Sequence, residues 1–140
     1  MKFYRAPFML AGMAALACAL WGGLLRMNWD LPVGGDANWI SFHGPLMVCA
    51  FVGTLIGLER AAGTGLLWAY LIPFCSGLGG LTLIAGNQGP AGPYMFLTAS
   101  LLLSVLFGTL SWRHRTLSEL FLLSGALAWA AGCLLWAEGA

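Results

Sequence analysis

The chain has 140 residues, of which 60% are hydrophobic and 8% are charged, and its formal net charge is +1. A soluble domain carries about a quarter charged residues, so a water-facing surface of this composition would expose large apolar patches. The composition therefore indicates a membrane protein. The nearly neutral charge, without any basic run, gives no reason to expect nucleic acid as a partner.

Five apolar segments follow one another, and each comes close to the roughly 20 residues that a helix needs to cross hydrocarbon. We expect them at residues 7–27, 41–60, 66–85, 94–112 and 119–136. Pro7 suits the first turn of the first helix, and Thr116 or Ser118 is expected to cap the last. The predicted fold is all-α, a single transmembrane helical domain over residues 1–140.

The basic residues predict the orientation of these spans. With the N-terminus inside, most of them fall on the cytoplasmic side, namely Lys2, Arg5, Arg60, Arg113 and Arg115. Arg26 then lies outside, where its long side chain can extend from the helix end. We expect a multi-pass protein of the bacterial inner membrane with a cytoplasmic N-terminus and a periplasmic C-terminus.

The second span, which starts near Phe42, holds the histidine that a membrane would surround. Gly44 follows His43 and leaves room for a flat ligand, and the thioether of Met47 lies four residues on, on the same helical face. An imidazole at this depth could ligate haem iron or copper, with Met47 packing on the ligand or serving as a soft donor.

Other partners for His43 are open at this point. Water, a backbone carbonyl or the loop acids Asp30 and Asp36 could satisfy the ring instead. Two residues, Ser41 and Asn38, could be the N-cap of this helix. If it is Ser41, Pro45 costs no backbone hydrogen bond, because the first four N–H groups of a helix are unpaired.

A second ligand is not evident in the sequence. His114 lies between two arginines after the fourth span, at the opposite membrane face, where we expect it to be solvated near lipid headgroups. One bundle cannot bring His43 and His114 to the same iron. A partner chain, a dimer or an open site would be needed.

The segment His43-Gly44-Pro45-Leu46-Met47 resembles the H-[AG]-x-x-M stretch that carries a haem-ligating histidine in haem-copper oxidase large subunits. It is similar, too, to the histidine-bearing helices of the NnrS family, membrane proteins that contain haem and copper and are linked to nitric oxide stress. The resemblance implies His43 as a ligand with Met47 as its neighbour. The copper-site and partner histidines of these families have no counterpart in this chain.

A longer stretch, HGPLMVCAFVGTLIGLERA with a later GALAWAAGCLLWAEG, resembles uncharacterised bacterial multi-pass membrane proteins. This resemblance covers most of the chain and implies no activity. It implies relatives that continue past a fifth helix, so we expect the chain to be a shortened version or a fragment.

Glu59 and Arg60 form an adjacent acid and base at the end of the second span, in a GLER segment that resembles MgtC-like membrane proteins. We expect them to anchor the span at the interface and to pair locally or with Arg113 and Arg115. The alternative is an ion path that starts at Glu59, which is also suggested by a third span interrupted around 76–80. No second acid lies deep enough to continue such a path, and the deep hydroxyls are expected to bond to backbone. They are Ser76, Thr82, Thr98, Ser100 and Ser104.

Small residues and cysteines carry weaker signals. Gly53 and Gly57 form a GxxxG motif, and Ala128 and Gly132 form a similar pair, so these positions allow close helix contacts and give a weak indication of a dimer. The four cysteines have no ligand spacing, and we expect each to be a small buried hydrophobe. A site shared by those at mid-membrane is the alternative, namely Cys18, Cys49 and Cys75.

Our leading hypothesis from the sequence is an inner-membrane protein that binds haem or copper through His43 and serves as a binding or assembly subunit in respiratory or nitric-oxide-related metabolism. An enzyme acting on its own is not expected, because no catalytic motif is recognisable. The alternatives are a small transporter or channel component that uses Glu59 and Arg60, and a structural accessory subunit of a larger membrane complex. The expected partners are the lipid bilayer and either other membrane subunits or further copies of the chain.

Overall fold

The computed structural model describes residues 5–29 and 37–139, and all regular structure within these ranges is helical. The elements are α1 (Ala6–Arg26), α2 (Ala37–Pro45), the π-helix η2 (Leu46–Val52), α3 (Gly53–Thr64), the 3-10 helix η3 (Leu67–Tyr70), α4 (Leu71–Ile84), α5 (Ala91–His114) and α6 (Leu117–Ala137). Five helical spans are long and apolar enough to cross a membrane, because α2, η2 and α3 form one helix and η3 leads directly into α4. The prediction of an all-α fold with five spans is confirmed.

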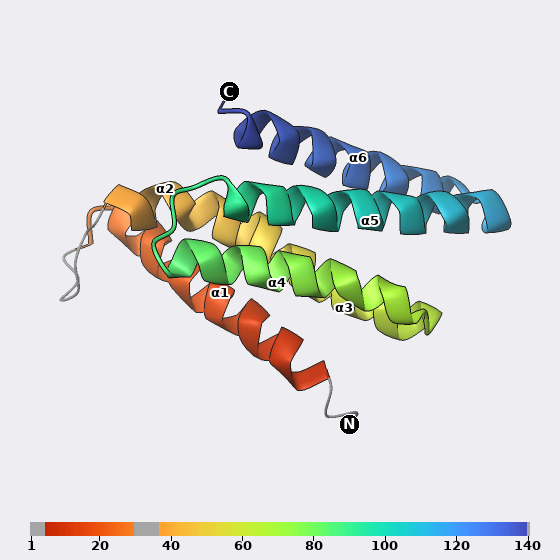
Figure 1. Cartoon of the computed structure of the whole chain (residues 1–140), viewed down its shortest axis with the longest axis horizontal. Coiled ribbons are helices and arrows are strands. Elements are labelled where there is room, and N and C mark those ends of the chain that lie inside the picture. Colours follow the sequence, from red (N-terminus) through yellow and green to blue (C-terminus); the bar gives the residue numbers. More distant parts are fainter. Residues whose placement is uncertain (1–4, 30–36, 140) are drawn as a thin grey trace.

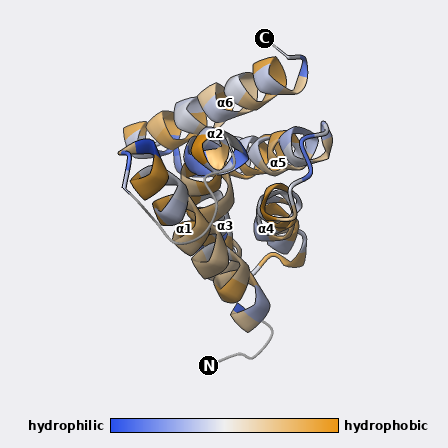
Figure 2. Ribbon diagram, turned by 90° about the vertical axis from the view of Figure 1, so that its left-hand side faces the viewer, coloured by the Kyte–Doolittle hydropathy of each residue, from blue (hydrophilic) through white to orange (hydrophobic). Residues whose placement is uncertain are grey.

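The helices are arranged around α4. It lies between α5 on one side and α1 and α3 on the other, and α6 covers α5 as the outermost helix (Figure 1). Most of the helical ribbon is apolar, and hydrophilic residues gather near the loops and helix ends (Figure 2). This is the distribution that a lipid-facing bundle requires, since polar groups are costly at mid-membrane.

The described basic residues fall into two groups along the bundle. The start of α1, the turn after α3 and the turn between α5 and α6 share one end, which carries Arg5, Arg60, Arg113 and Arg115 (Figure 1). Arg26, in the last turn of α1, lies at the other end.

The helix ends differ from the predicted bounds by a few residues. The second span runs from Asn38 to Thr64, and the fourth extends to His114. Gly65 at φ 69° and Arg115 at φ 52° follow α3 and α5 in the left-handed conformation. This conformation turns the chain out of the helix and lets the cap N–H bond back to the last turn.

The start of α6 follows the predicted cap in part. Thr116 is the N-cap residue, but its hydroxyl lies 3.2 Å from that of Ser118 and makes no capping bond to the backbone. Glu119 falls in the first turn of α6, where the helix dipole favours a carboxylate.

Pro45 lies inside its helix, because α2 already includes Ala37 and so begins before both predicted caps, Ser41 and Asn38. A proline in a helix interior lacks the N–H that would bond one turn back, and its ring crowds the preceding carbonyl. Ser41 is therefore not the N-cap, the position from which Pro45 would have cost no backbone hydrogen bond. The chain continues after Pro45 as the seven-residue π-helix η2, a wider winding that occurs frequently at functional sites.

Gly53 and Gly57 pack α3 against other helices of the same chain. A methyl group at Gly57 would lie 2.9 Å from the backbone nitrogen of Pro73 in α4. One at Gly53 would collide with the hydroxyl of Ser76 and the ring of Trp129. The GxxxG motif is thus used inside the bundle, so it is not free to serve as a dimer contact.

The glycine-rich part of α4 is continuous helix, and the interruption expected around 76–80 is wrong. A methyl group at Gly79 would lie 2.8 Å from the ring of Phe96, and one at Gly80 would lie 2.6 Å from Cβ of Ala50. These glycines are therefore positions of close packing rather than a break.

The outermost helix, α6, is mostly exposed. Its buried residues are Ala126, Ala130 and Cys133. The small pair Ala128 and Gly132 is exposed, and no atom lies within 4 Å of the place where a Gly132 side chain would begin. This face of α6 is therefore uncovered in the described part of the chain.

Candidate functional site

His43 on α2 is hydrogen-bonded to α1. Its Nδ1 lies 2.7 Å from the backbone oxygen of Ala19. Two adjacent glycines of α1 allow this approach: a Cβ at Gly23 would lie 2.9 Å from Cε1 of His43, and one at Gly22 would collide with the backbone carbonyl of Trp39. The imidazole is therefore held by the crossing of two helices.

This hydrogen bond determines what the other ring nitrogen can do. A carbonyl oxygen only accepts, so Nδ1 carries the proton, and Nε2 of the neutral ring keeps a lone pair. Metal-bound histidines usually donate their second N–H to a carbonyl or carboxylate in this way. Among residues 5–29 and 37–139, Nε2 of His43 has no hydrogen-bond partner. Asp30 and Asp36, the acids considered as partners, lie outside the described residues.

Gly44 and Met47 differ in how far they are exposed. Gly44 is exposed, and nothing lies within 4 Å of where its side chain would begin, so the backbone is open beside His43. Met47 belongs to η2, is half-buried and packs against the cluster that includes Ala19 and Leu46. The π winding that starts at Leu46 changes the four-residue spacing on which a shared face of His43 and Met47 was predicted.

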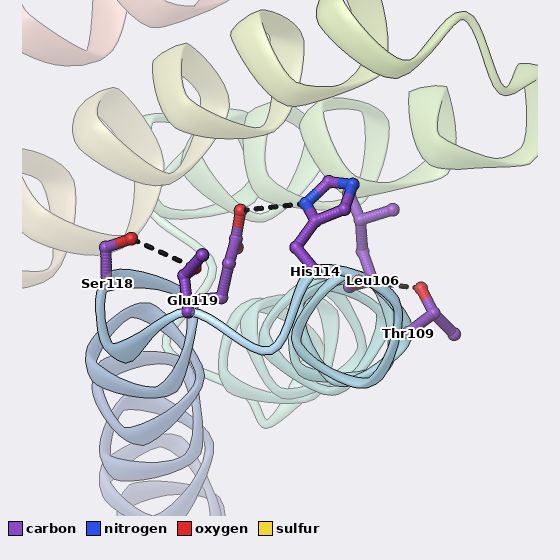
Figure 3. A network of polar contacts seen from close by, with 6 residues as sticks. Leu106, Thr109, His114, Ser118 and Glu119 are labelled. Atoms are coloured by element: carbon purple, nitrogen blue, oxygen red, sulfur yellow. Dashed lines mark hydrogen bonds and ion pairs between the residues drawn. The ribbon is translucent and has the colours of Figure 1, made fainter.

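His114, the other histidine, is placed far from this site. It is the last residue of α5, and that end of α5 and α2 lie at opposite ends of the bundle (Figure 1). Its Nδ1 lies 3.6 Å from Oε1 of Glu119, and Figure 3 shows the imidazole turned toward that carboxylate. Glu119 is largely buried, and its Oε2 has no hydrogen-bond partner among the described residues. The contact joins the two ends of the α5–α6 turn.

The residues around His43 fit one ligand position and not a complete metal site. Nowhere in residues 5–29 and 37–139 do three His, Cys, Asp or Glu side chains gather closely enough to hold a metal ion. A histidine with a fixed tautomer beside the open backbone of Gly44 could supply one ligand atom to a metal ion. The shared site of Cys18, Cys49 and Cys75 is not formed, and Cys75 packs against a different cluster from the other two.

Glu59 and Arg60 pair with each other at the end of α3. Oε1 of Glu59 lies 3.5 Å from Nη2 of Arg60, and the Glu59 side chain is 66% exposed. The guanidinium of Arg60 lies 5.7 Å from the ring centre of Phe107 on α5, within the range of a cation–π contact. The pair therefore has the geometry of an interfacial anchor.

The deep hydroxyls bond to backbone carbonyls, as predicted. Thr82, Thr98, Ser100 and Ser104 each donate to a carbonyl three or four residues earlier in their own helix. Ser76 instead bridges two elements and donates to the carbonyl of Cys49 in η2 at 2.6 Å. None of these hydroxyls continues a path from Glu59.

A backbone carbonyl was one of the open partners for His43, but the sequence did not identify it as that of Ala19. The glycines of α1 that admit the ring and the contact between His114 and Glu119 were missed from the sequence. The adjacent pair Gly22-Gly23 near the end of the first span was an available signal for a close crossing. The presence of a histidine and a carboxylate five residues apart across a turn, at His114 and Glu119, was another.

The fold and these sites define the class of protein: an all-helical chain whose five apolar helices suit an integral membrane protein. The sequence model of a family described as a domain of unknown function, DUF8744, matches residues 5–140, and the chain belongs to this family. No curated protein and no solved structure matches the chain.

Proposed function

We propose that the protein is a multi-pass protein of the bacterial inner membrane that binds haem iron or copper through Nε2 of His43. It acts as a binding or assembly subunit in respiratory or nitric-oxide-related metabolism rather than as a complete enzyme. The observation that carries the proposal is the 2.7 Å hydrogen bond from Nδ1 of His43 to the carbonyl of Ala19, which orients the ring and leaves Nε2 as the ligand atom.

The site requires a second chain or an exogenous ligand. His43 supplies one ligand atom, and His114 is at the other end of the bundle. A second copy of the protein or another membrane subunit would supply any further ligand. The open backbone at Gly44 is where a flat macrocycle would come close to α2.

The proposed orientation places the His43 end of the bundle at the periplasmic side. The four described arginines at the opposite end support it, because cytoplasmic ends carry the excess of basic residues. Reporter fusions test this assignment. An alkaline phosphatase fused after Ala140 should be active and a green fluorescent protein at the same point should be dark; the reverse pattern would overturn the orientation.

An absorption spectrum of protein purified in mild detergent tests the cofactor directly. We expect a Soret band, or stoichiometric copper by elemental analysis, that is lost in His43→Ala and kept in the matched variant His114→Ala. Protein without either signal, or His43→Ala protein that retains full cofactor, would remove the proposal. Gly44→Leu is a second probe: it fills open space on α2 and should lower haem occupancy while leaving the thermal unfolding of the apoprotein unchanged within about 0.5 kcal/mol.

A further inference from the structure

A groove beside the turn between α5 and α6 combines a charged residue with apolar walls. It lies at the end of the bundle opposite to α2 (Figure 1). Its volume is about 420 Å³, which falls within the range usual for ligand pockets. Residues of both helices line this α5–α6 groove, namely Gly108, Ser111, Trp112, Arg115, Leu120 and Leu123. The groove shares no residue with the His43 site or with the Glu59–Arg60 pair.

The α5–α6 groove runs from the end of the bundle toward its middle. Arg115 follows the last residue of α5, and Trp112 in the last turn is 82% exposed, as are the aromatic side chains that lie among lipid headgroups. Gly108 is two helical turns earlier and therefore about 10 Å deeper. Leu120 and Leu123 form an apolar wall on α6. One end of the groove is thus cationic and the other is apolar.

Two polar side chains that line the groove have no protein partner. Arg115 makes no ion pair with any residue in 5–29 or 37–139, because Glu119, the acid of this turn, lies against His114 instead (Figure 3). Ser111 is buried, with 9% of its surface exposed, and its hydroxyl bonds to none of the same described residues. The hydroxyl of Thr109, by contrast, donates to a carbonyl three residues earlier in α5. A buried hydroxyl and a cation are therefore available to a ligand in the groove.

These features fit a phospholipid better than a free anion. Arginine and hydroxyl donors bind phosphate oxygens, and basic pockets between membrane helices bind anionic headgroups. A free phosphate ion would gain nothing from the leucine wall, whereas an acyl chain would lie along it. A zwitterionic lipid would bring its ammonium group close to two arginines, Arg113 and Arg115. The charge and the apolar walls together favour a lipid with a net negative headgroup.

We propose that the α5–α6 groove binds one anionic glycerophospholipid. Its phosphate accepts hydrogen bonds from Arg115 and Ser111, and one acyl chain lies against Gly108, Leu120 and Leu123. The lipid would connect the end of α5 with α6, the outermost and mostly exposed helix. The proposal does not depend on a cofactor at His43.

Native mass spectrometry of the full chain, delipidated in a neutral detergent, tests the proposal. Dioleoylphosphatidylglycerol is the anionic probe, and dioleoylphosphatidylcholine, which has the same acyl chains, is the zwitterionic control. We expect one phosphatidylglycerol per chain, bound about tenfold more tightly than phosphatidylcholine, the scale of one charge-assisted hydrogen bond. Inorganic phosphate at the same concentration should not displace the lipid.

Two arginines of the turn provide a matched pair for the headgroup. Arg115→Gln should lower the affinity for phosphatidylglycerol about tenfold, because it removes the charge that lines the groove. Arg113→Gln should leave the affinity unchanged, because Arg113 is exposed and does not line the groove. Arg115→Lys keeps the charge without the planar guanidinium and should retain part of the affinity.

Two glycines provide a matched pair for the acyl chain. No atom lies within 4 Å of where a Gly108 side chain would begin, so Gly108→Leu fills the groove and should abolish lipid binding. Gly132→Leu makes the same change at an open position on α6 outside the groove and should leave binding intact. Thermal unfolding without phosphatidylglycerol identifies any variant that has lost its fold. Ser111→Ala replaces such a variant and should lower the affinity about fivefold.

Three results would overturn the proposal. Equal binding of the two lipids, or unchanged affinity in Arg115→Gln, would show that only unspecific surrounding lipid is present. Unchanged affinity in Gly108→Leu would place the acyl chain outside the groove. Displacement by inorganic phosphate would make a free anion the ligand. None of these results changes the absorption spectrum expected for the His43 site, so the two proposals can fail separately.

Discussion

The hydroxyl of Ser76 on α4 donates a 2.6 Å hydrogen bond to the backbone carbonyl of Cys49 in η2, so a side chain of one span satisfies the irregular backbone of another. The hydrogen bond connects α4 with the π-helix that follows Pro45, so it joins two elements rather than two residues of one helix. This bond ties the centre of the second span to α4.

Ser76→Ala should therefore lower the free energy of unfolding by about 1 kcal/mol, the scale of a hydrogen bond between membrane helices. Ser100→Ala is the matched control, because Ser100 is equally buried but bonds the carbonyl of Leu97 in its own helix. Its expected effect is below about 0.5 kcal/mol. Reversible unfolding in mixed micelles measures the free energy of both variants. If Ser76→Ala and Ser100→Ala lose the same amount, the hydrogen bond between the two elements contributes no more than one within a helix.

Gly23→Ala should weaken the crossing of α1 and α2, because the new methyl group would lie 2.9 Å from Cε1 of His43 and push the ring away from Ala19. Gly44→Ala adds the same methyl group to a helix with nothing within 4 Å. Both changes gain about the same helix propensity. The difference between the unfolding temperatures of the two variants therefore reports the contact of the new methyl group with the His43 ring. We expect a lower unfolding temperature for Gly23→Ala than for Gly44→Ala, and identical temperatures would contradict the close approach.

Gly57→Ala should destabilise the bundle by about 1–3 kcal/mol, the usual cost of overpacking. The obstacle is the backbone nitrogen of Pro73 at 2.9 Å, which cannot rotate away. Gly132→Ala on the exposed face of α6 is the control and should be neutral or slightly stabilising. Sedimentation in detergent should show the same oligomeric state for both variants and the parent chain; dimer loss in Gly57→Ala alone would place that glycine at an interface between copies.

Glu59 and Arg60 should contribute unequally to stability. Glu59→Gln should change the unfolding free energy by less than about 0.5 kcal/mol, because its carboxylate is mostly exposed. Arg60→Gln should cost about 0.5–1 kcal/mol through the lost contact with the Phe107 ring. A double-mutant cycle with Phe107→Leu measures that contact. A fall in proton flux across liposomes in Glu59→Gln would contradict the anchor role and favour transport.

Hydropathy was enough to predict the five spans, because the cost of placing polar groups in hydrocarbon acts on each residue separately. The backbone bonding of the deep hydroxyls was predictable for a similar reason, since Thr98 or Ser104 finds a carbonyl within its own turn. Both predictions depend on local interactions, and the structure confirms both.

The tertiary contacts were not predictable from one sequence. The hydroxyl of Ser76 bonds the backbone carbonyl of Cys49, which is 27 residues away in the sequence. The contact of Trp129 with Cys49 depends on how α6 lies along the bundle. Neither residue spacing nor composition shows which distant residues will be in contact. The glycines that permit these contacts are visible in the sequence, but the sequence does not show what each one packs against.

The backbone contact of Gly57 with Pro73 also bears on how the chain is assembled. α3 and α4 are neighbours in sequence, joined by a short turn, so they can pair as a helical hairpin soon after both have left the ribosome. We expect this hairpin to be a local folding unit during co-translational insertion, onto which α5 and then α6 are added. Arrested nascent chains that end after α4 should accordingly be protected from protease over the α3–α4 segment before α6 has been synthesised.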